Sequence, residues 1–240
     1  MCGRFFRHTP REELAAAFRA DPGIAASEAG YNIAPGQPIV TVRFNPHTGR
    51  RTLDDLSWGL VAHFEKDRNV AWKTINARAE TLDKARPFRA AFKKRRCLVV
   101  VDGFFEWRAF GKAKQPYAVA LPSEKPFALA GVWEGWQDPA TGEWLRSCSI
   151  VTTESNPDLR AIHHRMPAII EEADYARWLG EEPAGIEELK ALLRPYPSPL
   201  KVWPVSPHLN RPGLVEGPAA LDPVADPAAA TDEADRASKK

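Results

Sequence analysis

The second residue of the chain is a cysteine, and its position could give it chemistry that Cys97 and Cys148 lack. Removal of Met1 would leave Cys2 with a free α-amine and a thiol on adjacent carbons, a 1,2-aminothiol. With an aldehyde, the amine of such a pair condenses to an imine, and the thiol then closes a five-membered thiazolidine. The alternative is a structural cysteine, since this residue type is often buried as a small hydrophobe.

Glu106 is a candidate carboxylate for proton transfer in such chemistry. An unperturbed α-amine and thiol have pKa values of about 8 and about 8.5, so at neutral pH they need help with proton transfer. Glu106 stands among Phe104, Phe105 and Trp107, where loss of solvation would raise its carboxyl pKa toward neutrality. An alternating strand could instead turn Glu106 to water, and four residues do not decide between these two readings.

His163 and His164 precede an apolar segment and bring an imidazole into consideration. A histidine is suited to proton transfer near neutral pH, although a lone histidine is more often structural. Adjacent residues on an extended segment face opposite sides, so we expect at most one of the two to reach a site. Adjacent histidines seldom chelate one ion together, and the sequence has no Cys-x-x-Cys pair, so we expect neither a metal nor a cofactor.

Charge is unevenly distributed along the chain. The net charge is +2 overall and +5 over residues 1–215, because six acidic and only three basic residues lie after residue 215. Residues 84–96 hold seven basic and no acidic side chains. This run is either a solvated helix face or a surface that follows phosphates.

The chain must build a fold that positions these residues. Its 240 residues, 44% of them hydrophobic, are enough for a sizeable core. Short apolar runs separated by turn signals predict an α+β fold: a single domain with a mainly antiparallel, barrel-like β core flanked by short helices. We expect the domain to span residues 2–215 and residues 216–240 to form a disordered acidic, Ala- and Pro-rich tail. The absence of a long apolar run or a leader predicts a cytoplasmic monomer that has no membrane contact.

Six ordered sequence blocks between residues 2 and 210 resemble the SOS-response-associated peptidase (SRAP) family. They are residues 1–4 (Met-Cys-Gly-Arg), 31–35 (Tyr-Asn-Ile-Ala-Pro), 76–81 (Asn-Ala-Arg-Ala-Glu-Thr), 95–107, 162–167 (Ile-His-His-Arg-Met-Pro) and 205–210. Two positions depart from the family's pattern: Gly36 stands where threonine is common and Phe105 where tyrosine is common.

The resemblance implies a protein of the DNA-damage response that captures abasic sites in single-stranded DNA, and it assigns roles residue by residue. It implies that Cys2 forms a thiazolidine crosslink after Met1 removal, which shields the lesion. Asn76 would position the reacting centre, Glu106 would hold the α-amine and move protons, and His163 would assist opening of the sugar ring. The DNA-binding residues that it implies are Arg4, Asn32, Trp72, Arg78 and Arg165. Association with the nucleoid would follow from DNA binding.

Two other classes of function stay open at the level of sequence. Cys2 could serve an N-terminal-nucleophile thiol peptidase or amidohydrolase, with Glu106 or His163 as the base. The basic run could instead serve a noncatalytic module that binds single-stranded or modified DNA. Whether the protein also has abasic-site lyase or N-terminal autoproteolytic activity is likewise open.

Overall fold

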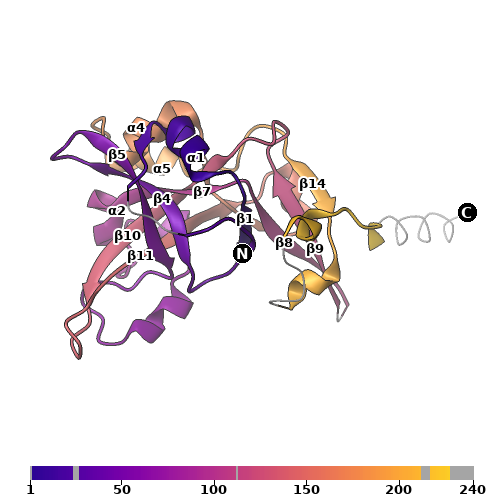
Figure 1. Ribbon diagram of the computed structural model, residues 1–240, viewed down its shortest axis with the longest axis horizontal. Helices are drawn as coiled ribbons and strands as arrows, with labels where there is room; N and C mark the ends of the chain where they lie inside the picture. The colour runs from indigo at the N-terminus through magenta and orange to yellow at the C-terminus, as the bar shows by residue number, and fades with distance from the viewer. Residues whose placement is uncertain (1, 24–26, 112, 212–216, 228–240) are drawn as a thin grey trace, which may run out of the picture.

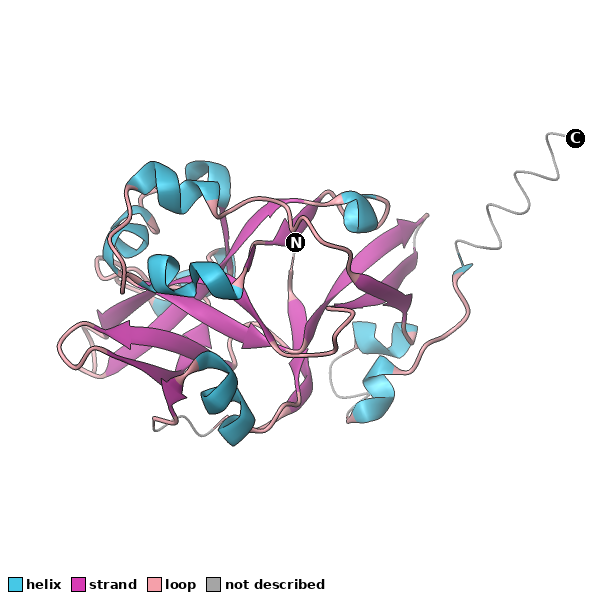
Figure 2. Ribbon diagram, turned by 90° about the horizontal axis from the view of Figure 1, so that it is seen from above, coloured by secondary structure: helices cyan, strands magenta, loops and turns pink. Residues whose placement is uncertain are grey.

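A computed structural model of the protein describes residues 2–23, 27–111, 113–211 and 217–227. Two β-sheets form most of the molecule, and short helices lie around them (Figures 1 and 2). No helix in the described ranges is both long enough and apolar enough to span a bilayer.

Five strands of the larger sheet close into a barrel. They follow one another in the order β11 (Trp144–Glu154), β10 (Phe127–Gln137), β7 (Arg96–Val101), β4 (Pro38–Asn45) and β5 (Arg50–Trp58). Neighbours along this path are antiparallel, and a parallel β11–β5 pair closes the ring. The predicted α+β, barrel-like fold is therefore confirmed, and its closing pair makes the barrel mixed.

The barrel strand β7 shows how the sequence creates two cores. Its residues 97–101 are all fully buried, as expected for a continuous Val-rich run covered on both faces. Leu98 and Val100 point into a first core, whereas Val99 and Val101 point into a second core that also contains Cys2. Because strand side chains alternate, β7 divides the two cores from one another.

Small strands extend the barrel at its edges. They are β2 (Ala20–Asp21), β6 (Asn76–Arg78), β12 (Arg165–Pro167) and β13 (Ile169–Ile170). β6 runs parallel to β11, with Asn76 opposite Ile150. This pairing holds the predicted site residue Asn76 against the barrel wall.

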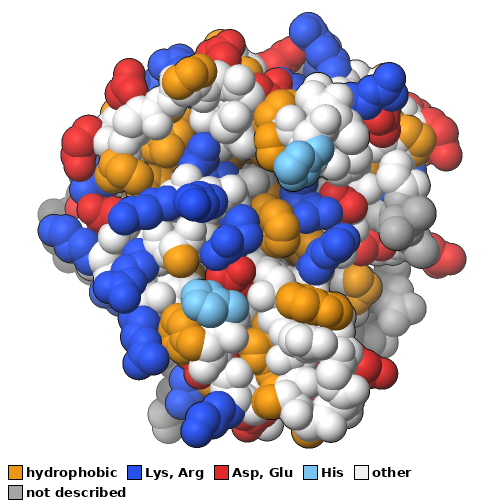
Figure 3. All heavy atoms as spheres, turned by 90° about the vertical axis from the view of Figure 1, so that its left-hand side faces the viewer, with side chains coloured by type: hydrophobic (Ala, Val, Ile, Leu, Met, Phe, Trp, Pro, Cys, Tyr) orange, Lys and Arg blue, Asp and Glu red, His pale blue; other side chains and the backbone are white. Residues whose placement is uncertain are grey.

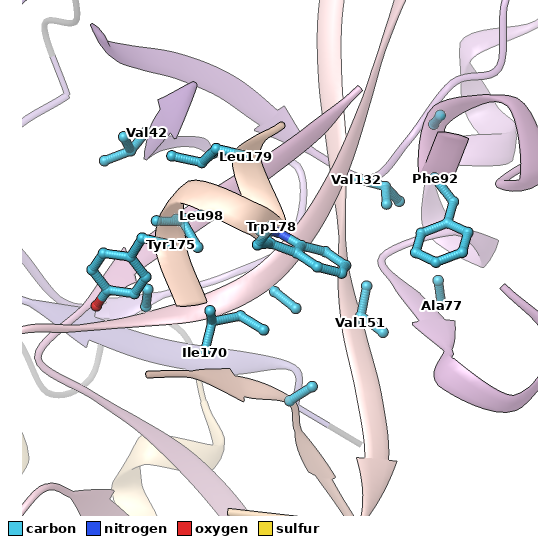
Figure 4. Close-up of a cluster of buried hydrophobic side chains, with 14 of the residues drawn as sticks. Val42, Ala77, Phe92, Leu98, Val132, Val151, Ile170, Tyr175, Trp178 and Leu179 are labelled. Atoms are coloured by element: carbon cyan, nitrogen blue, oxygen red, sulfur yellow. The ribbon is translucent and has the colours of Figure 1, made fainter. Parts of the chain in front are cut away.

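Helices cover the first core. These are α1 (Arg11–Phe18), α2 (Arg89–Lys94), α4 (Tyr175–Leu179) and α5 (Ile186–Ala191), whereas α3 (Pro157–Arg160) buries Leu159 in the second core. Trp178 of α4 is fully buried, and its indole N–H donates to the Cys97 carbonyl at 2.9 Å. Figure 4 shows its ring between Leu98 and Val132. The Trp178 hydrogen bond ties the helical layer to the barrel strand that carries Cys97.

The second sheet carries the N-terminal residues. It is antiparallel, in the order β14 (Lys201–Pro204), β9 (Ala113–Ala120), β8 (Gly103–Phe110), β1 (Arg4–Arg7) and β3 (Gly30–Ile33). Buried Asp102, between β7 and β8, accepts hydrogen bonds from the backbone N–H groups of His8 and Thr9. These bonds fix the chain just after β1, and with it the position of Cys2.

The expectation of a disordered tail from residue 216 is wrong for residues 217–227. The 3₁₀ helix η5 (Pro218–Leu221) buries Ala220 in a third apolar cluster. Trp203 donates to the Leu221 carbonyl at 2.8 Å, and Tyr117 donates to Asp226 at 2.7 Å. The composition of the segment did not predict its order, because the side chains that contact it are aromatic residues elsewhere in the sequence. Residues 228–240 lie outside the described ranges.

Candidate functional site

Strand pairing brings Cys2 and Glu106 together. Arg4 of β1 pairs with Phe105 of β8, so the antiparallel register directs the chain before Arg4 toward Glu106. The Cys2 side chain is fully buried, and it packs in the second core with Trp58 and Ile150. Burial, and next the Glu106 carboxylate, raise the pKa of the Cys2 thiol well above its ordinary value. The thiol is therefore neutral near pH 7.

Asn76 contacts the backbone of Cys2 directly. Its side-chain N–H donates to the Cys2 carbonyl at 2.8 Å. Its side-chain oxygen is buried and accepts no hydrogen bond from the described residues. Asn76 thus fixes the second residue of the chain and keeps one acceptor available beside it.

Glu106 lies in an apolar setting, which is one of the two alternatives that its neighbours in the sequence left open. Only 1% of its surface is exposed, and burial raises the pKa of its carboxyl to about 7. The negative charge of the Glu106 carboxylate also raises the pKa of the Cys2 thiol. A carboxyl that is poised near neutral pH can both accept and return a proton.

The two adjacent histidines line different hollows, but the expectation that they face opposite sides is wrong, because their rings stack with centroids 4.5 Å apart. His163 lines the same cavity as Glu106, whereas His164 lines a different hollow beside Arg160. The His163 Nδ1 atom lies 3.0 Å from both the backbone nitrogen and the carbonyl oxygen of Arg165, which orients the ring. Burial lowers the His163 pKa, which favours the neutral imidazole.

Glu106 and His163 face a cavity of about 870 Å³. Gly3 and Arg4 form part of its wall, while neither Cys2 nor Asn76 lines it. The remaining lining residues are Trp107, Ala109, Phe110, Ala113, Lys114, Gln115, Pro207, Asn210 and Pro227. The cavity gives a reactant access to Glu106 and His163, and Gly3, the residue after Cys2, forms part of its wall. No group of three potential metal ligands occurs within the described ranges.

The predicted DNA-binding residues differ in their surroundings. Arg4 donates to the Asn32 side-chain oxygen at 2.7 Å, so these two form one unit at the cavity. Arg78 is exposed on β6 and lies two residues from Asn76, which places both on the same side of that strand. The Arg165 guanidinium instead bonds to Glu80 at 2.5 Å and to the Thr152 carbonyl at 2.5 Å. A phosphate at Arg165 would have to compete with Glu80.

Trp72 lies apart from the main cavity. It belongs to the 3₁₀ helix η1 (Arg68–Lys73) and is 64% exposed. Its ring borders a small hollow of about 110 Å³ together with Gly36 and Trp58. An exposed indole of this kind can serve as a stacking surface for a base.

Gly36 is required by its backbone conformation. Its φ of +86° lies in the left-handed region, and an added Cβ would come within 3.1 Å of the Trp72 ring. We therefore expect Gly36→Ala to lower the free energy of unfolding by about 1–2 kcal/mol for the left-handed conformation, with a further loss from the close approach to Trp72. Urea denaturation measures this, and Gly49→Ala is the matched control, since it shares the positive φ but meets nothing within 4 Å. An equal loss in both variants would mean that φ alone, and not Trp72, sets the cost.

Phe105, the other departure from the family pattern, does not face Glu106. It is fully buried in the third cluster, and its ring centroid lies 5.2 Å from that of Phe6. Neighbouring residues on a strand point to opposite faces, so a phenol at this position would lie away from the carboxylate.

Sequence reasoning did not single out two residues at the site, Asn210 and Glu80. The Trp107 indole donates to the Asn210 side-chain oxygen at 2.5 Å, and Asn210 donates to the Lys114 carbonyl at 3.1 Å. Glu80 holds Arg165. Both Asn210 and Glu80 lie inside the sequence blocks that resemble the family. Their place in these blocks was the feature of the sequence that could have identified them.

Comparison with known proteins gives consistent results. The sequence matches the model of the family described as "SOS response associated peptidase (SRAP)" over residues 1–212. It is 36% identical over 225 residues to abasic site processing protein YoqW of Bacillus subtilis, a match that covers 90% of this chain and 99% of that protein. Abasic site processing protein HMCES of Gallus gallus is 30% identical over 192 residues, which cover 70% of this chain and 57% of that protein.

A crystal structure of a protein from Bacteroides thetaiotaomicron has the same fold. Its TM-score is 0.83 at 24% identity, and the match covers 93% of this chain and all of that one. Together with the sequence matches, this shows that the chain belongs to the SOS response associated peptidase (SRAP) family.

Proposed function

We propose that the protein captures abasic sites in single-stranded DNA by forming a thiazolidine through Cys2 after Met1 is removed. The observation that carries the proposal is the arrangement of Cys2, Asn76 and Glu106: a buried thiol, an amide bonded to its own backbone and a carboxyl with a pKa of about 7. The related proteins named for abasic site processing support the same substrate. Met1 lies outside the described residues.

The proposed reaction balances without a cofactor or an oxidant. The ring-opened deoxyribose presents an aldehyde at C1′. The Cys2 amine adds to this carbon, and loss of one water gives an imine. The Cys2 sulfur then bonds to the same carbon while the thiol proton moves to the imine nitrogen, which closes the thiazolidine.

Glu106 and His163 would move the protons in these steps. Glu106 takes a proton from the α-ammonium group and can return one as water leaves, because its carboxyl pKa of about 7 permits both states near neutral pH. His163 shares its cavity and is largely neutral, which suits it to accept the hydroxyl proton when the sugar ring opens. The thiol is shielded in the core and must turn toward the sugar carbon once the imine has formed.

The DNA strand would be held by contacts that do not depend on its base sequence. Arg4, oriented by Asn32, and exposed Arg78 would bind phosphates, and Trp72 would stack on a base. Arg165 is bonded to Glu80. It would contribute either by releasing Glu80 and binding a phosphate, or through its backbone N–H, which orients His163. A duplex would hide C1′ within the stack of base pairs, and we therefore propose single-stranded DNA as the substrate. We also propose that the protein acts as a monomer.

The state of the Cys2 thiol favours this reaction over a thiol peptidase. A cysteine that attacks an acyl carbon needs a lowered pKa, whereas burial raises the pKa of this thiol. An imine route avoids that requirement because the amine reacts first and the thiol attacks within the same residue. Hydrolysis of a small amide without DNA, lost in Cys2→Ala, would instead favour the peptidase.

Asn76→Ala is expected to slow covalent capture about 100-fold, the typical cost of misplacing a reacting group by about 1 Å. The variant loses the 2.8 Å hydrogen bond to the Cys2 carbonyl. Single-turnover kinetics with an abasic oligonucleotide measure the rate. Asn69→Ala, an exposed asparagine on η1, is the matched control. Equal rates for Asn76→Ala and the wild type would remove Asn76 from the site.

A further inference from the structure

The basic run at residues 84–96 has no role in the proposed crosslinking centre. α2 buries Ala91 and Phe92 against the first core, so its remaining side chains point outward. Five side chains of the run are exposed: Lys84, Arg86, Arg89, Lys93 and Lys94. Figure 3 views the side of the molecule that carries α2 in Figure 1, and Lys and Arg side chains gather in a band across it.

The acidic residues close to these five cations are already paired with other basic side chains. Glu80 bonds to Arg165 at 2.5 Å, Asp83 lies 3.3 Å from Lys190, and Glu134 bonds to Arg95 at 2.7 Å. None of the five exposed cations forms an ion pair with a described residue. We call these five residues the α2 strip, and its positive charge is not neutralised by its own surroundings.

The α2 strip continues from the proposed DNA site. Arg78, on the same side of β6 as Asn76, is followed by η2 (Ala79–Thr81), which packs on β11. The chain then passes directly to Lys84 and α2. One continuous segment therefore leads from Asn76, which holds Cys2, to the exposed cations.

The composition of the strip favours phosphates over an acidic protein. Protein interfaces have an apolar core, with aromatic residues enriched and lysine depleted. The exposed large hydrophobic residues in the described ranges are Trp72, Trp144 and Val224, and none of them lies on α2. Simple cations without such a core are typical of sequence-blind backbone contacts.

We propose that the α2 strip binds backbone phosphates of the captured DNA strand at some distance from the lesion, so that the footprint extends beyond the crosslinking cavity. This inference rests on the proposed function, because it takes the strand held at Cys2 as the ligand. It predicts that affinity depends on strand length.

Two single strands test the proposal, one of about 8 and one of about 24 nucleotides. Each carries a central tetrahydrofuran, an abasic analogue that lacks the aldehyde, so that binding is measured at equilibrium. Arg89→Gln/Lys93→Gln/Lys94→Gln should weaken binding of the long strand at least tenfold. It should also reduce the slope of log K against log salt by about 2, at about 0.7 for each lost contact. Binding of the short strand should not change.

Three further measurements make the result decisive. Arg19→Gln/Lys125→Gln/Lys201→Gln removes the same charge from exposed positions away from α2 and should bind both strands like the wild type. Lys93→Arg/Lys94→Arg keeps the charge and should keep the affinity. Crosslinking of the short strand with a true abasic site should proceed at the wild-type rate in the α2 variant.

Other outcomes contradict the proposal in distinct ways. Equal losses on the short and long strands, or in the control variant, would show a general charge effect and overturn the strip as a site. An unchanged salt slope in the α2 variant would also overturn it and direct attention to an acidic protein partner. The wild type could bind the long strand more tightly than the α2 variant does, yet crosslink no abasic strand. In that case the proposed function would be wrong, while the α2 strip would still be a phosphate-binding site.

Discussion

Cys2→Ala is expected to abolish the covalent product with abasic DNA completely. The change removes the sulfur that closes the thiazolidine, and the remaining imine hydrolyses when the protein is denatured. The assay incubates the protein with a single-stranded oligonucleotide that bears one abasic site and then separates the products on a denaturing gel. The wild type should give a shifted band, and Cys2→Ala and Cys2→Ser should give none.

The other two cysteines provide the matched control. Cys97 and Cys148 are as fully buried as Cys2, but neither has an α-amine that can be freed. Cys148→Ala should therefore retain the band, provided that it folds as judged by circular dichroism. A band that persists in Cys2→Ala would rule out the thiazolidine at Cys2 and indicate a stable covalent bond at another residue.

Glu106→Gln is expected to slow crosslinking by about 10²–10⁴-fold, the usual contribution of a positioned acid–base group. Glutamine preserves the size of the side chain and its ability to form hydrogen bonds, but it cannot exchange a proton. The rate of band formation under single-turnover conditions measures the effect. Glu80→Gln, which changes an exposed carboxylate bonded to Arg165, is a control for loss of a nearby charge and should be much less severe.

The same variant should be more stable than the wild type at alkaline pH. The carboxyl pKa of Glu106 rises from 4.5 to about 7 on folding, so folding favours the protonated form. Its stabilising contribution is present below pH 4.5 and is lost as the pH rises through about 7. The stability advantage of Glu106→Gln should therefore grow by roughly 3 kcal/mol between about pH 4.5 and about pH 8, and urea denaturation at both values measures it. A constant difference would show that the carboxyl is not perturbed by folding.

Local sequence patterns predicted only part of the structure around the site. The Val-rich run of β7 indicated a buried strand, whereas the aromatic neighbours of Glu106 left both an apolar and a solvated setting open, and the structure has the apolar one. His163 lines the cavity and His164 does not, but strand alternation does not explain this, because neither residue lies on a strand and their rings stack with centroids 4.5 Å apart. The β7 prediction depends on neighbours within a few residues, which is the range over which strand periodicity acts.

Contacts between distant parts of the chain could not be predicted in the same way. Thr9 suits a helix N-cap, but its hydroxyl donates to Asp102, 93 positions away, and α1 begins after an uncapped Pro10. The parallel β11–β5 pair that closes the barrel has no local signal. Burial of Ala220 depends on aromatic side chains that precede it in the chain, and composition alone therefore suggested disorder there.

The identity of the N-terminal peptide after reaction tests the central claim most directly. Protein that has been crosslinked to an abasic oligonucleotide is digested with nuclease and protease, and the peptides are identified by tandem mass spectrometry. The account predicts a peptide that begins at Cys2, lacks Met1 and carries the sugar on the nitrogen and sulfur of that residue. Crosslinked protein that retains Met1, or an adduct on Cys97, Cys148 or a lysine, would contradict it.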